Sequence, residues 1–288
     1  MKIKISPIFY QGCKKKLIKK GLIDLFPKDI DTFYDMCAGS AIVSMNTNAN
    51  AYVVNDISTQ LWGYYNMFKK HSADEIIDYI VRTINDFGLR RKSISNNDEH
   101  REEHKKQYMA LRDFANANKQ IILYYICAFY SFSQQMRFNS KGEFNMPCGN
   151  NAFTAENEEF IRQGCEFFGK DNVSLWNGDF RDVVRYRRFN CNDFVYFDTP
   201  YLDTTATYNE NGGWSVRDEE SLYKALEALD KQGIKWGLSN SFSSKGKENT
   251  MLINWCKDKG WKVYHFDIKY SCMGKGNANN DEVYICNY

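Results

Sequence analysis

The sequence lacks the long apolar runs and the leader pattern that would place a protein in a membrane or outside the cell. Its longest apolar run, residues 121–132, is interrupted by tyrosines, is too short to span a bilayer and fits a buried helix. Residues 1–4 lack the apolar core of a signal peptide. The nine cysteines form no Cys-x-x-Cys pair, which favours reduced thiols. We therefore expect a cytoplasmic protein.

Several common catalytic signatures are also missing. Without a G-x-S-x-G elbow, a serine hydrolase is disfavoured, and without G-x-G-x-x-G, hydride transfer on a dinucleotide is disfavoured. His71 and His265 are isolated. His100 and His104 fit the H-x-x-E-H spacing of inverted zinc peptidases, but residues 98–106 contain almost no apolar side chain that could bury a metal site. We interpret this segment as a solvated charged helix and expect no metal.

Charge alone does not identify a partner, because the formal net charge is only +2. Basic residues do cluster at residues 14–20, 90–92 and 181–188. Each cluster alone fits a solvated face, and together they permit a surface that follows phosphates. Aromatic residues make up 16% of the chain; most should lie in the core, and a few could stack on bases.

The chain has only four prolines and no repeats, and its patterns fall into three blocks. Up to about residue 60, two short apolar strands end in acidic residues and flank a helical segment, which predicts a β-α-β unit. Residues 61–165 are mostly helical in pattern. From residue 166, strands and helices alternate again, so residues 1–60 and 166–288 should form one α/β sheet with the middle block inserted. The expected strands are 32–36, 51–54, 173–176, 194–197, 234–238, 261–266 and 282–286, and the expected helices are 14–26, 74–87, 99–116, 121–132, 218–231 and 248–259.

Ligands of such sheets bind beyond the carboxyl ends of the strands. The strand at 194–197 ends in Asp198-Thr199-Pro200-Tyr201. The Asp198 carboxylate and the Thr199 carbonyl, which Pro200 helps to hold, could accept both hydrogens of an exocyclic amine. The amine lone pair would then point outward, so a methyl group on a sulfonium placed in line could be transferred by direct displacement. Tyr201 could stack on an extruded base. The alternative is an ordinary turn that Asp198 caps.

Three other strand ends could serve a cofactor. Asp35 is followed by a turn of small residues, which would let the backbone approach a nucleoside. Asp56 could hold ribose hydroxyls or cap the next helix. Asp179 and its neighbouring backbone could read a cofactor adenine, although Asn177-Gly178 also favours a plain turn.

In this order along the chain, the segments resemble the motifs of the Dam-type N6-adenine-specific DNA methyltransferase family. SPIFYQGCK at residues 6–14 is similar to the N-terminal cofactor motif of the family, and DMCAGS at 35–40 to its first Rossmann-like turn. ND at 55–56 and NGDF at 177–180 resemble later cofactor motifs, and DTPY at 198–201 resembles the catalytic D-P-P-Y. Residues 238–240 and 282–288 resemble the last strands. The resemblance covers most of the chain.

The resemblance implies an α/β, Rossmann-like S-adenosylmethionine-dependent methyltransferase sheet with an inserted, mainly helical target-recognition domain at residues 61–165. The implied reaction transfers a methyl group from S-adenosylmethionine to the N6 amine of a flipped adenine in double-stranded DNA and leaves S-adenosylhomocysteine. Asp198, Thr199, Pro200 and Tyr201 would act on the target adenine. The cofactor site would be lined by Tyr10, Lys14, Asp35, Ala38, Gly39, Ser40, Asp56, Asp179 and Phe180.

Residues 136–147 resemble the DNA-contacting hairpin of the family, with a turn at Ser140-Lys141-Gly142. The residues implied to contact DNA are Arg137, Asn139, Asn145 and Pro147. Arg137 would read a guanine, because a guanidinium pairs with it through two hydrogen bonds; a plain surface charge is the alternative.

The sequence departs from the family pattern at several positions: Thr199 and Met36 replace prolines, Ala41 replaces a glycine, and Asn150 stands where some relatives carry a basic residue. We therefore do not assign the GATC target of Dam-type enzymes to this chain. Methylation of the cytosine N4 amine and an inactive DNA-binding relative stay open as alternatives. We expect a monomer.

Overall fold

The computed structural model describes residues 3–202, 213–244, 247–268 and 280–288, which fold into two compact units. One unit comprises Met1–Ile3, Lys14–Ser58 and Asn172–Tyr288, and the other comprises Lys4–Cys13 and Thr59–Asp171. The boundaries that we expected near residues 60 and 165 thus lie a few residues away. Lys4–Cys13 departs from the prediction and joins the second unit. There the Tyr125 hydroxyl donates a 3.0 Å hydrogen bond to the Pro7 carbonyl.

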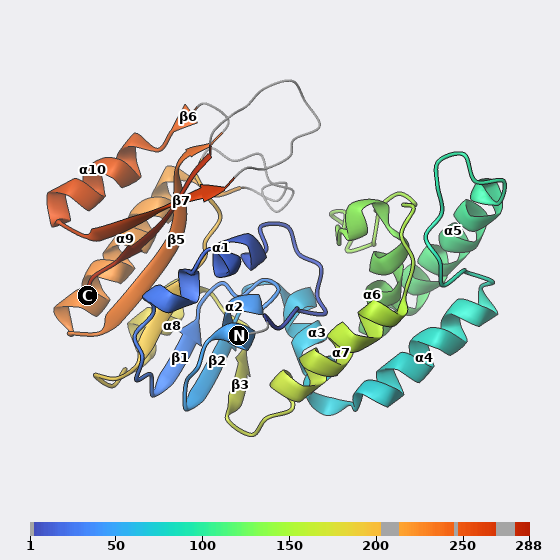
Figure 1. The fold of residues 1–288 in the computed structure, drawn as a ribbon, viewed down its shortest axis with the longest axis horizontal. Helices are drawn as coiled ribbons and strands as arrows, with labels where there is room; N and C mark the ends of the chain where they lie inside the picture. The colour runs from blue at the N-terminus through green and yellow to red at the C-terminus, as the bar shows by residue number, and fades with distance from the viewer. Residues whose placement is uncertain (1–2, 203–212, 245–246, 269–279) are drawn as a thin grey trace. The chain divides into compact units, whose positions relative to one another are not determined.

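The first unit is built on one mixed sheet with the order β3-β2-β1-β4-β5-β8-β7, and β6 pairs with β5 (Figure 1). Neighbouring strands from β3 to β5 run parallel, whereas β8 runs antiparallel to both β5 and β7. The chain moves outward from β1 to β3 and then returns to the other side of β1 with β4. The strands are β1 (Thr32–Asp35), β2 (Ala51–Asn55), β3 (Val173–Trp176), β4 (Phe194–Phe197), β5 (Lys235–Ser244), β6 (Lys247–Glu248), β7 (Lys262–Ile268) and β8 (Asn280–Cys286).

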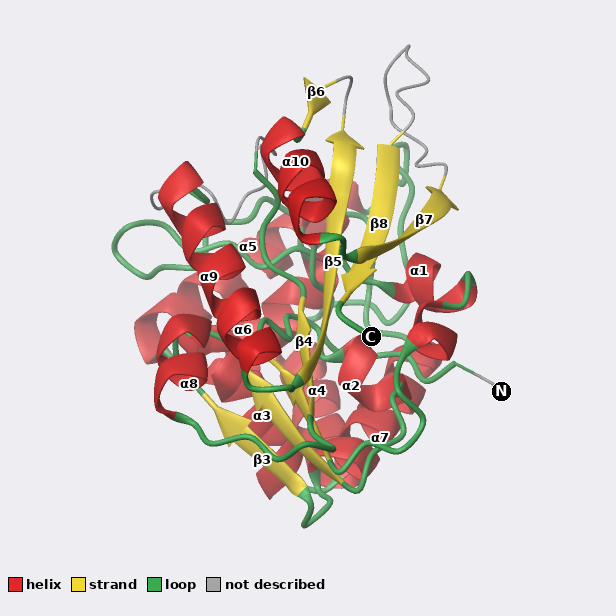
Figure 2. Cartoon of the chain, turned by 90° about the vertical axis from the view of Figure 1, so that its left-hand side faces the viewer, coloured by secondary structure: helices red, strands yellow, loops and turns green. Residues whose placement is uncertain are grey.

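Helices cover both faces of this sheet. In Figure 2, α8, α9 and α10 lie on one side of the strands, and α1 and α2 lie on the other. The bounds are α1 (Lys15–Lys19), α2 (Ile42–Asn46), α8 (Phe180–Tyr186), α9 (Val216–Lys231) and α10 (Thr250–Lys259). The single helix that we expected at 14–26 is instead α1 followed by a 3-10 turn, Leu22–Leu25, because Gly21 adopts a left-handed φ of 95° between them.

Alternation of side chains along the strands creates two cores. Val195 and Phe197 of β4 point to the face where Leu222, Leu226 and Leu252 of the covering helices pack. Phe194 and Tyr196 point to the opposite face, where the ring of Phe26 lies 4.9 Å and 5.3 Å from theirs. Burial of both faces explains why β4 reads as a continuous apolar run. The core therefore holds the carboxyl end of β4 rigidly.

The second unit is mainly helical between β2 and β3. It contains α3 (Thr59–Lys70), α4 (Ala73–Asp86), α5 (Arg101–Asn118), α6 (Ile121–Tyr130), the 3-10 turn Phe132–Gln134 and α7 (Ala155–Phe168). As expected from its composition, α6 is buried along most of its length. A β-bridge between Phe138 and Phe144 closes the predicted hairpin. In the part of the chain that the structure describes, every helix is too short or too polar to cross a bilayer.

The tight pairing of β5 with β8 makes Gly237 sensitive to substitution. A Cβ atom at this position would lie 2.7 Å from Cζ of the fully buried Tyr284. Gly237→Ala should therefore lower the free energy of unfolding by about 1–3 kcal/mol, the usual cost of overpacking a core. The exposed Lys235→Ala on the same strand should change it by less than about 0.5 kcal/mol. Urea unfolding of both variants tests this, and equal midpoints would show that Tyr284 adjusts without cost.

Candidate active site

The order of the sheet brings two acidic strand ends together. Asp35 closes β1, Asp198 follows the last residue of β4, and the register places Asp35 opposite Tyr196 on the neighbouring strand. The strand order reverses between β1 and β4, and the crevice at such a reversal is where open α/β sheets bind ligands. The structure thus places both predicted acids at the expected ligand-binding position of the fold.

The loop after β1 is held in place by backbone hydrogen bonds. The Met36 amide donates to the Tyr196 carbonyl at 2.9 Å, and the Ala38 amide donates to the Asn55 carbonyl at 2.9 Å. Gly39 has a φ of 52°, and its amide donates to Asp56 Oδ2 at 2.9 Å. Ser40 is buried at the end of this loop. The predicted small-residue turn therefore exists, and Asp56 and its neighbour Asn55 shape it.

Asn55 joins the loops that follow three strands. Its side-chain amide donates to the Met36 carbonyl at 2.8 Å and to the Gly178 carbonyl at 3.0 Å. Asn177 in turn donates to the Asp56 carbonyl at 2.8 Å. The Asn55 side-chain oxygen is buried and has no hydrogen-bond partner among the described residues. We predicted Asn55 only as part of a motif; its role as a brace depends on contacts that are distant in sequence.

The carboxylates of Asp35, Asp56 and Asp198 meet in this corner, and the first two are buried. Burial, opposed by a 2.6 Å hydrogen bond from Ser44 and assisted by the charges of Asp198 and Asp56, raises the pKa of Asp35 to about 7. Burial also raises the pKa of Asp56. Asp35 Oδ1 is buried without a partner among the described residues. Because like charges and desolvation both disfavour ionisation, the corner favours a cationic ligand.

Lys14 forms an ion pair with the predicted catalytic acid. Its Nζ lies 2.6 Å from Asp198 Oδ1, and both side chains are largely buried. Burial raises the pKa of Asp198 to about 6, although the charge and hydrogen bond of Lys14 hold it down. We expected Lys14 to line the cofactor site; the structure shows it on the acid of the catalytic motif.

The rest of the catalytic motif is also ordered around Lys14. The Lys14 Nζ lies 5.2 Å from the centre of the Tyr201 ring, and the Tyr201 hydroxyl donates a 2.8 Å hydrogen bond to Glu282 on β8. Thr199 is 2% exposed, and its hydroxyl has no hydrogen-bond partner within the described part of the chain. Pro200 is half-buried. Sequence reasoning assigned no role to Glu282.

After β3, Asp179 caps α8, which begins at Phe180; we had expected a turn here but had not predicted this helix. Although burial opposes the shift, hydrogen bonds and charge from Arg181 hold the pKa of Asp179 below its usual value. The ring of Phe180 packs in the core, 5.9 Å from that of Phe197. Both residues therefore have structural partners, and their cofactor contacts stay a prediction.

The remaining predicted residues belong to the second unit. Tyr10 accepts a backbone hydrogen bond from Cys13 at 3.3 Å, and its expected cofactor contact also stays a prediction. His104 is buried in α5, which corrects our interpretation of a wholly solvated helix, because it packs 5.8 Å from the ring of Tyr130. Among the described residues, no three Cys, His, Asp or Glu side chains are grouped as metal ligands.

The hairpin residues form an internal network. Arg137 Nε donates to Asn145 Oδ1 at 2.9 Å. The Asn139 side chain accepts the amides of Lys141 and Glu143 at 2.9 Å and 3.0 Å, which shapes the hairpin tip. Pro147 is exposed. The arginine that we predicted to read a base is thus oriented by another predicted DNA-contacting residue.

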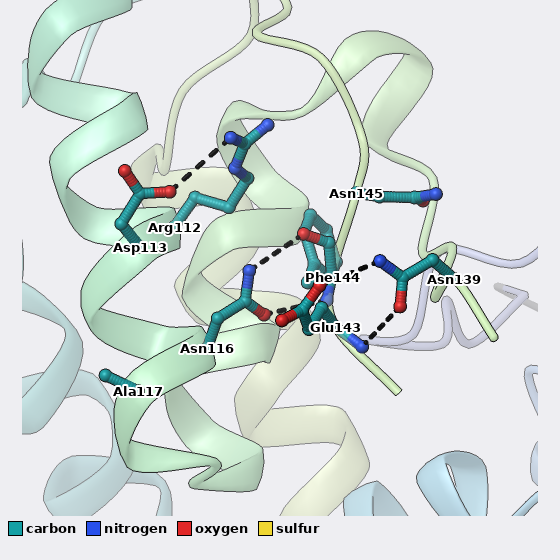
Figure 3. Close-up of a pocket in the computed structure, with 8 residues that line it drawn as sticks. All are labelled: Arg112, Asp113, Asn116, Ala117, Asn139, Glu143, Phe144 and Asn145. Atoms are coloured by element: carbon teal, nitrogen blue, oxygen red, sulfur yellow. Dashed lines mark hydrogen bonds and ion pairs between the residues drawn. The ribbon is translucent and has the colours of Figure 1, made fainter. Parts of the chain in front are cut away.

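The hairpin packs against α5, and the two line an open hollow of about 470 Å³. Asn116 fastens the two, because its amide donates to the Phe144 carbonyl at 3.1 Å and its oxygen accepts the Phe144 amide at 2.7 Å (Figure 3). On the helix side of the hollow, Arg112 and Asp113 form an ion pair with each other at 3.4 Å (Figure 3). The walls are mostly polar.

The reversed mixed sheet, the small-residue loop and the acidic corner beside DTPY define a Rossmann-like methyltransferase. The model of the D12 class N6 adenine-specific DNA methyltransferase family matches residues 10–270. The chain belongs to this family.

Curated relatives agree with this assignment. The chain is 33% identical over 291 residues to the Type II methyltransferase M.FokI of Planomicrobium okeanokoites, and 30% identical over 292 residues to modification methylase StsI of Streptococcus sanguinis. Each alignment covers 98% of this chain and 43% of the relative. A DNA adenine methylase of Serratia marcescens is 25% identical over 202 residues, which cover 67% of each protein. The chain thus spans less than half the length of the first two relatives.

The buried Asp35 carboxyl should make the stability of the ligand-free protein depend on pH. Its pKa is about 7 when folded and near 3.8 when unfolded, so the folded state binds the proton more tightly. Stability should therefore be lost as the pH rises from about 4 to about 7. Asp35→Asn removes this charge, so the variant should have a higher melting temperature than the wild type at about pH 8. This difference in melting temperature should shrink toward about pH 5. Asp29→Asn, at an exposed position, is the control. A difference in melting temperature between Asp35→Asn and the wild type that does not change with pH would contradict the prediction.

Proposed function

We propose that this chain is a site-specific DNA adenine methyltransferase that transfers a methyl group from S-adenosylmethionine to the N6 amine of a flipped adenine in double-stranded DNA. The observation that carries the proposal is the position of Asp198-Thr199-Pro200-Tyr201 at the end of β4, beside the buried carboxylates of β1 and β2. Membership of the N6 adenine-specific family supports the choice of base.

The residues of the corner suit the cofactor. Asp35 Oδ1 and Asn55 Oδ1 are buried acceptors without partners among the described residues, and S-adenosylmethionine carries ammonium and hydroxyl donors. Asp56 would hold ribose hydroxyls, and the loop at Ala38 and Gly39 lets a nucleoside approach the backbone. When bound, the cofactor supplies an activated methyl group on a sulfonium. Its positive charge complements the carboxylates, which lowers the free-energy cost of ionising them.

Asp198 and Thr199 hold the target amine in this proposal. Lys14 contacts Asp198 Oδ1, so Oδ2 is assigned to one amine hydrogen, and the Thr199 carbonyl is assigned to the other. Two acceptors turn the amine lone pair out of the base plane and toward the methyl donor. The Asp198 charge assists this grip only when the carboxyl is ionised, and Lys14 favours that form. Tyr201 would stack on the extruded base.

The direct test is sequencing that reports modified bases in DNA from cells expressing the chain. Adenine methylation at one sequence supports the proposal, whereas methylated cytosine with unmodified adenine refutes it. Asp198→Ala should lower turnover by at least about 1,000-fold, because it removes a transition-state acceptor. Cofactor affinity, measured by calorimetry, should stay within about threefold, because the acid acts on the target base. Asp182→Ala, at an exposed position, is the control. Undiminished turnover of the Asp198 variant would contradict the role of Asp198 as an acceptor for the target amine.

The hairpin network predicts the source of target choice. Arg137→Ala should reduce discrimination against a wrong base by about 1–3 kcal/mol, the value of one bidentate pair. Asn145→Ala should produce a smaller loss in the same direction, because Asn145 orients Arg137. Lys141→Ala at the exposed tip should weaken binding to all sequences equally. Methylation rates on a panel of sites measure these effects, and unchanged site preference in the Arg137 variant would contradict the assignment.

A further inference from the structure

Glu282 is a buried acid that reaches the catalytic motif from a distant strand. It lies on β8, which is separated from β4 by β5 in the sheet, and only 6% of it is exposed. Its Oε2 accepts the 2.8 Å hydrogen bond from the Tyr201 hydroxyl, although the two residues are 81 positions apart in sequence. Because burying a carboxylate is costly unless it is paired, this contact is a strong constraint on the Tyr201 ring.

The contact continues into the rest of the motif. The Lys14 Nζ lies 5.2 Å from the centre of the Tyr201 ring, and the same atom lies 2.6 Å from Asp198 Oδ1. The four side chains therefore form one connected chain from β8 to the end of β4. A substitution of Glu282 should therefore change the properties of Asp198, because side chains in one buried polar network are energetically coupled.

We propose that Glu282 is a positioning residue for the target base: by holding the Tyr201 hydroxyl, it sets the ring orientation on which the base stacks while Asp198 grips its amine. This inference rests on the proposed function. A tyrosine ring has two rotatable side-chain bonds, so fixing its hydroxyl at the far end fixes both. Without the tether, the ring could rotate away and leave the extruded base without its stacking partner.

The protonation states support this arrangement. Burial raises the pKa of Tyr201 far above its usual value, and the charges of Glu282 and Asp198 raise it further. The hydroxyl therefore keeps its proton and acts as the donor, while Glu282 acts as the acceptor. A carboxylate acceptor makes this bond stronger than one between neutral groups.

Glu282 also acts on Asp198 through its charge. The groups whose charges bear on the Asp198 carboxyl include Lys14, which lowers its pKa, and Glu282 and Asp56, which raise it; Asp35 and Asp198 repel each other. Removing the negative charge at position 282 should therefore lower the pKa of Asp198. The acid limb of the rate profile should then move to lower pH, whereas a purely structural acid would leave this limb in place.

The test compares Glu282→Gln, Glu282→Ala and Tyr201→Phe in the full chain, with the exposed Glu248→Gln as the matched control. Four quantities are measured: kcat and KM on a DNA duplex with its target, the fluorescence of 2-aminopurine at the target position, and the dissociation constant of S-adenosylmethionine. Glu282→Gln and Tyr201→Phe are nearly isosteric, and their melting temperatures report whether the fold is intact.

Glu282→Ala and Tyr201→Phe should each lower kcat by about 10-fold to 100-fold, the range for losing one charge-assisted hydrogen bond. Both should change the fluorescence of the flipped base and leave cofactor affinity within about twofold. The double variant should be no slower than the slower single variant, because both changes remove the same contact. Glu282→Gln keeps an acceptor, so it should retain most of the rate and shift the acid limb downward.

Wild-type rate and fluorescence in folded Glu282→Ala would overturn the inference, and so would single effects that multiply in the double variant. In both cases adenine methylation by the wild type would leave the proposed function standing. A wild-type protein that binds DNA but methylates no adenine would instead overturn the proposed function and, with it, this role of Glu282.

Discussion

The ion pair between Lys14 and Asp198 is the contact around which the catalytic corner is organised. The reversal of strand order places Asp35 and Asp198 at the ends of adjacent parallel strands, with Asp56 one strand further, so three carboxylates share one corner of the fold. Their mutual repulsion would favour protonation, and a protonated Asp198 would be a poorer acceptor for an amine. Lys14 supplies a positive charge at 2.6 Å and keeps the pKa of Asp198 below the value that burial alone would give.

The departures from the family pattern fit the local backbone in different ways. The Met36 amide donates a hydrogen bond to the Tyr196 carbonyl, which a proline could not do because it lacks the N–H group. This hydrogen bond holds the loop where a proline would restrict its backbone. Ala41 precedes α2 with a φ of 56°, where a glycine would be less strained. The loop before it is held by hydrogen bonds from the Gly39 amide to Asp56 and from the Ala38 amide to the Asn55 carbonyl. Thr199 keeps the carbonyl that the proposed chemistry requires.

Much of the fold was predictable because its signals are local. β3 and β4 begin and end where their apolar runs do, and α5, α6 and α9 follow their helical patterns within two residues at each end. β5 extends to Ser244, beyond its prediction, because pairing with β8 continues through polar residues. The placement of Lys4–Cys13 depends on tertiary contacts of Pro7 and had no local signal.

The candidate site shows the same limit at the level of side chains. The acids Asp35, Asp56 and Asp198 were found because each ends a strand, and strand ends meet at one edge of a parallel sheet. The partners that set their properties were not found in the same way. Lys14 was assigned to the cofactor, and Glu282 carried no role, because both reach the motif through the folded sheet. Sequence position thus identified the chemical groups, while the antiparallel insertion of β8 between β5 and β7 supplied the geometry that constrains Tyr201.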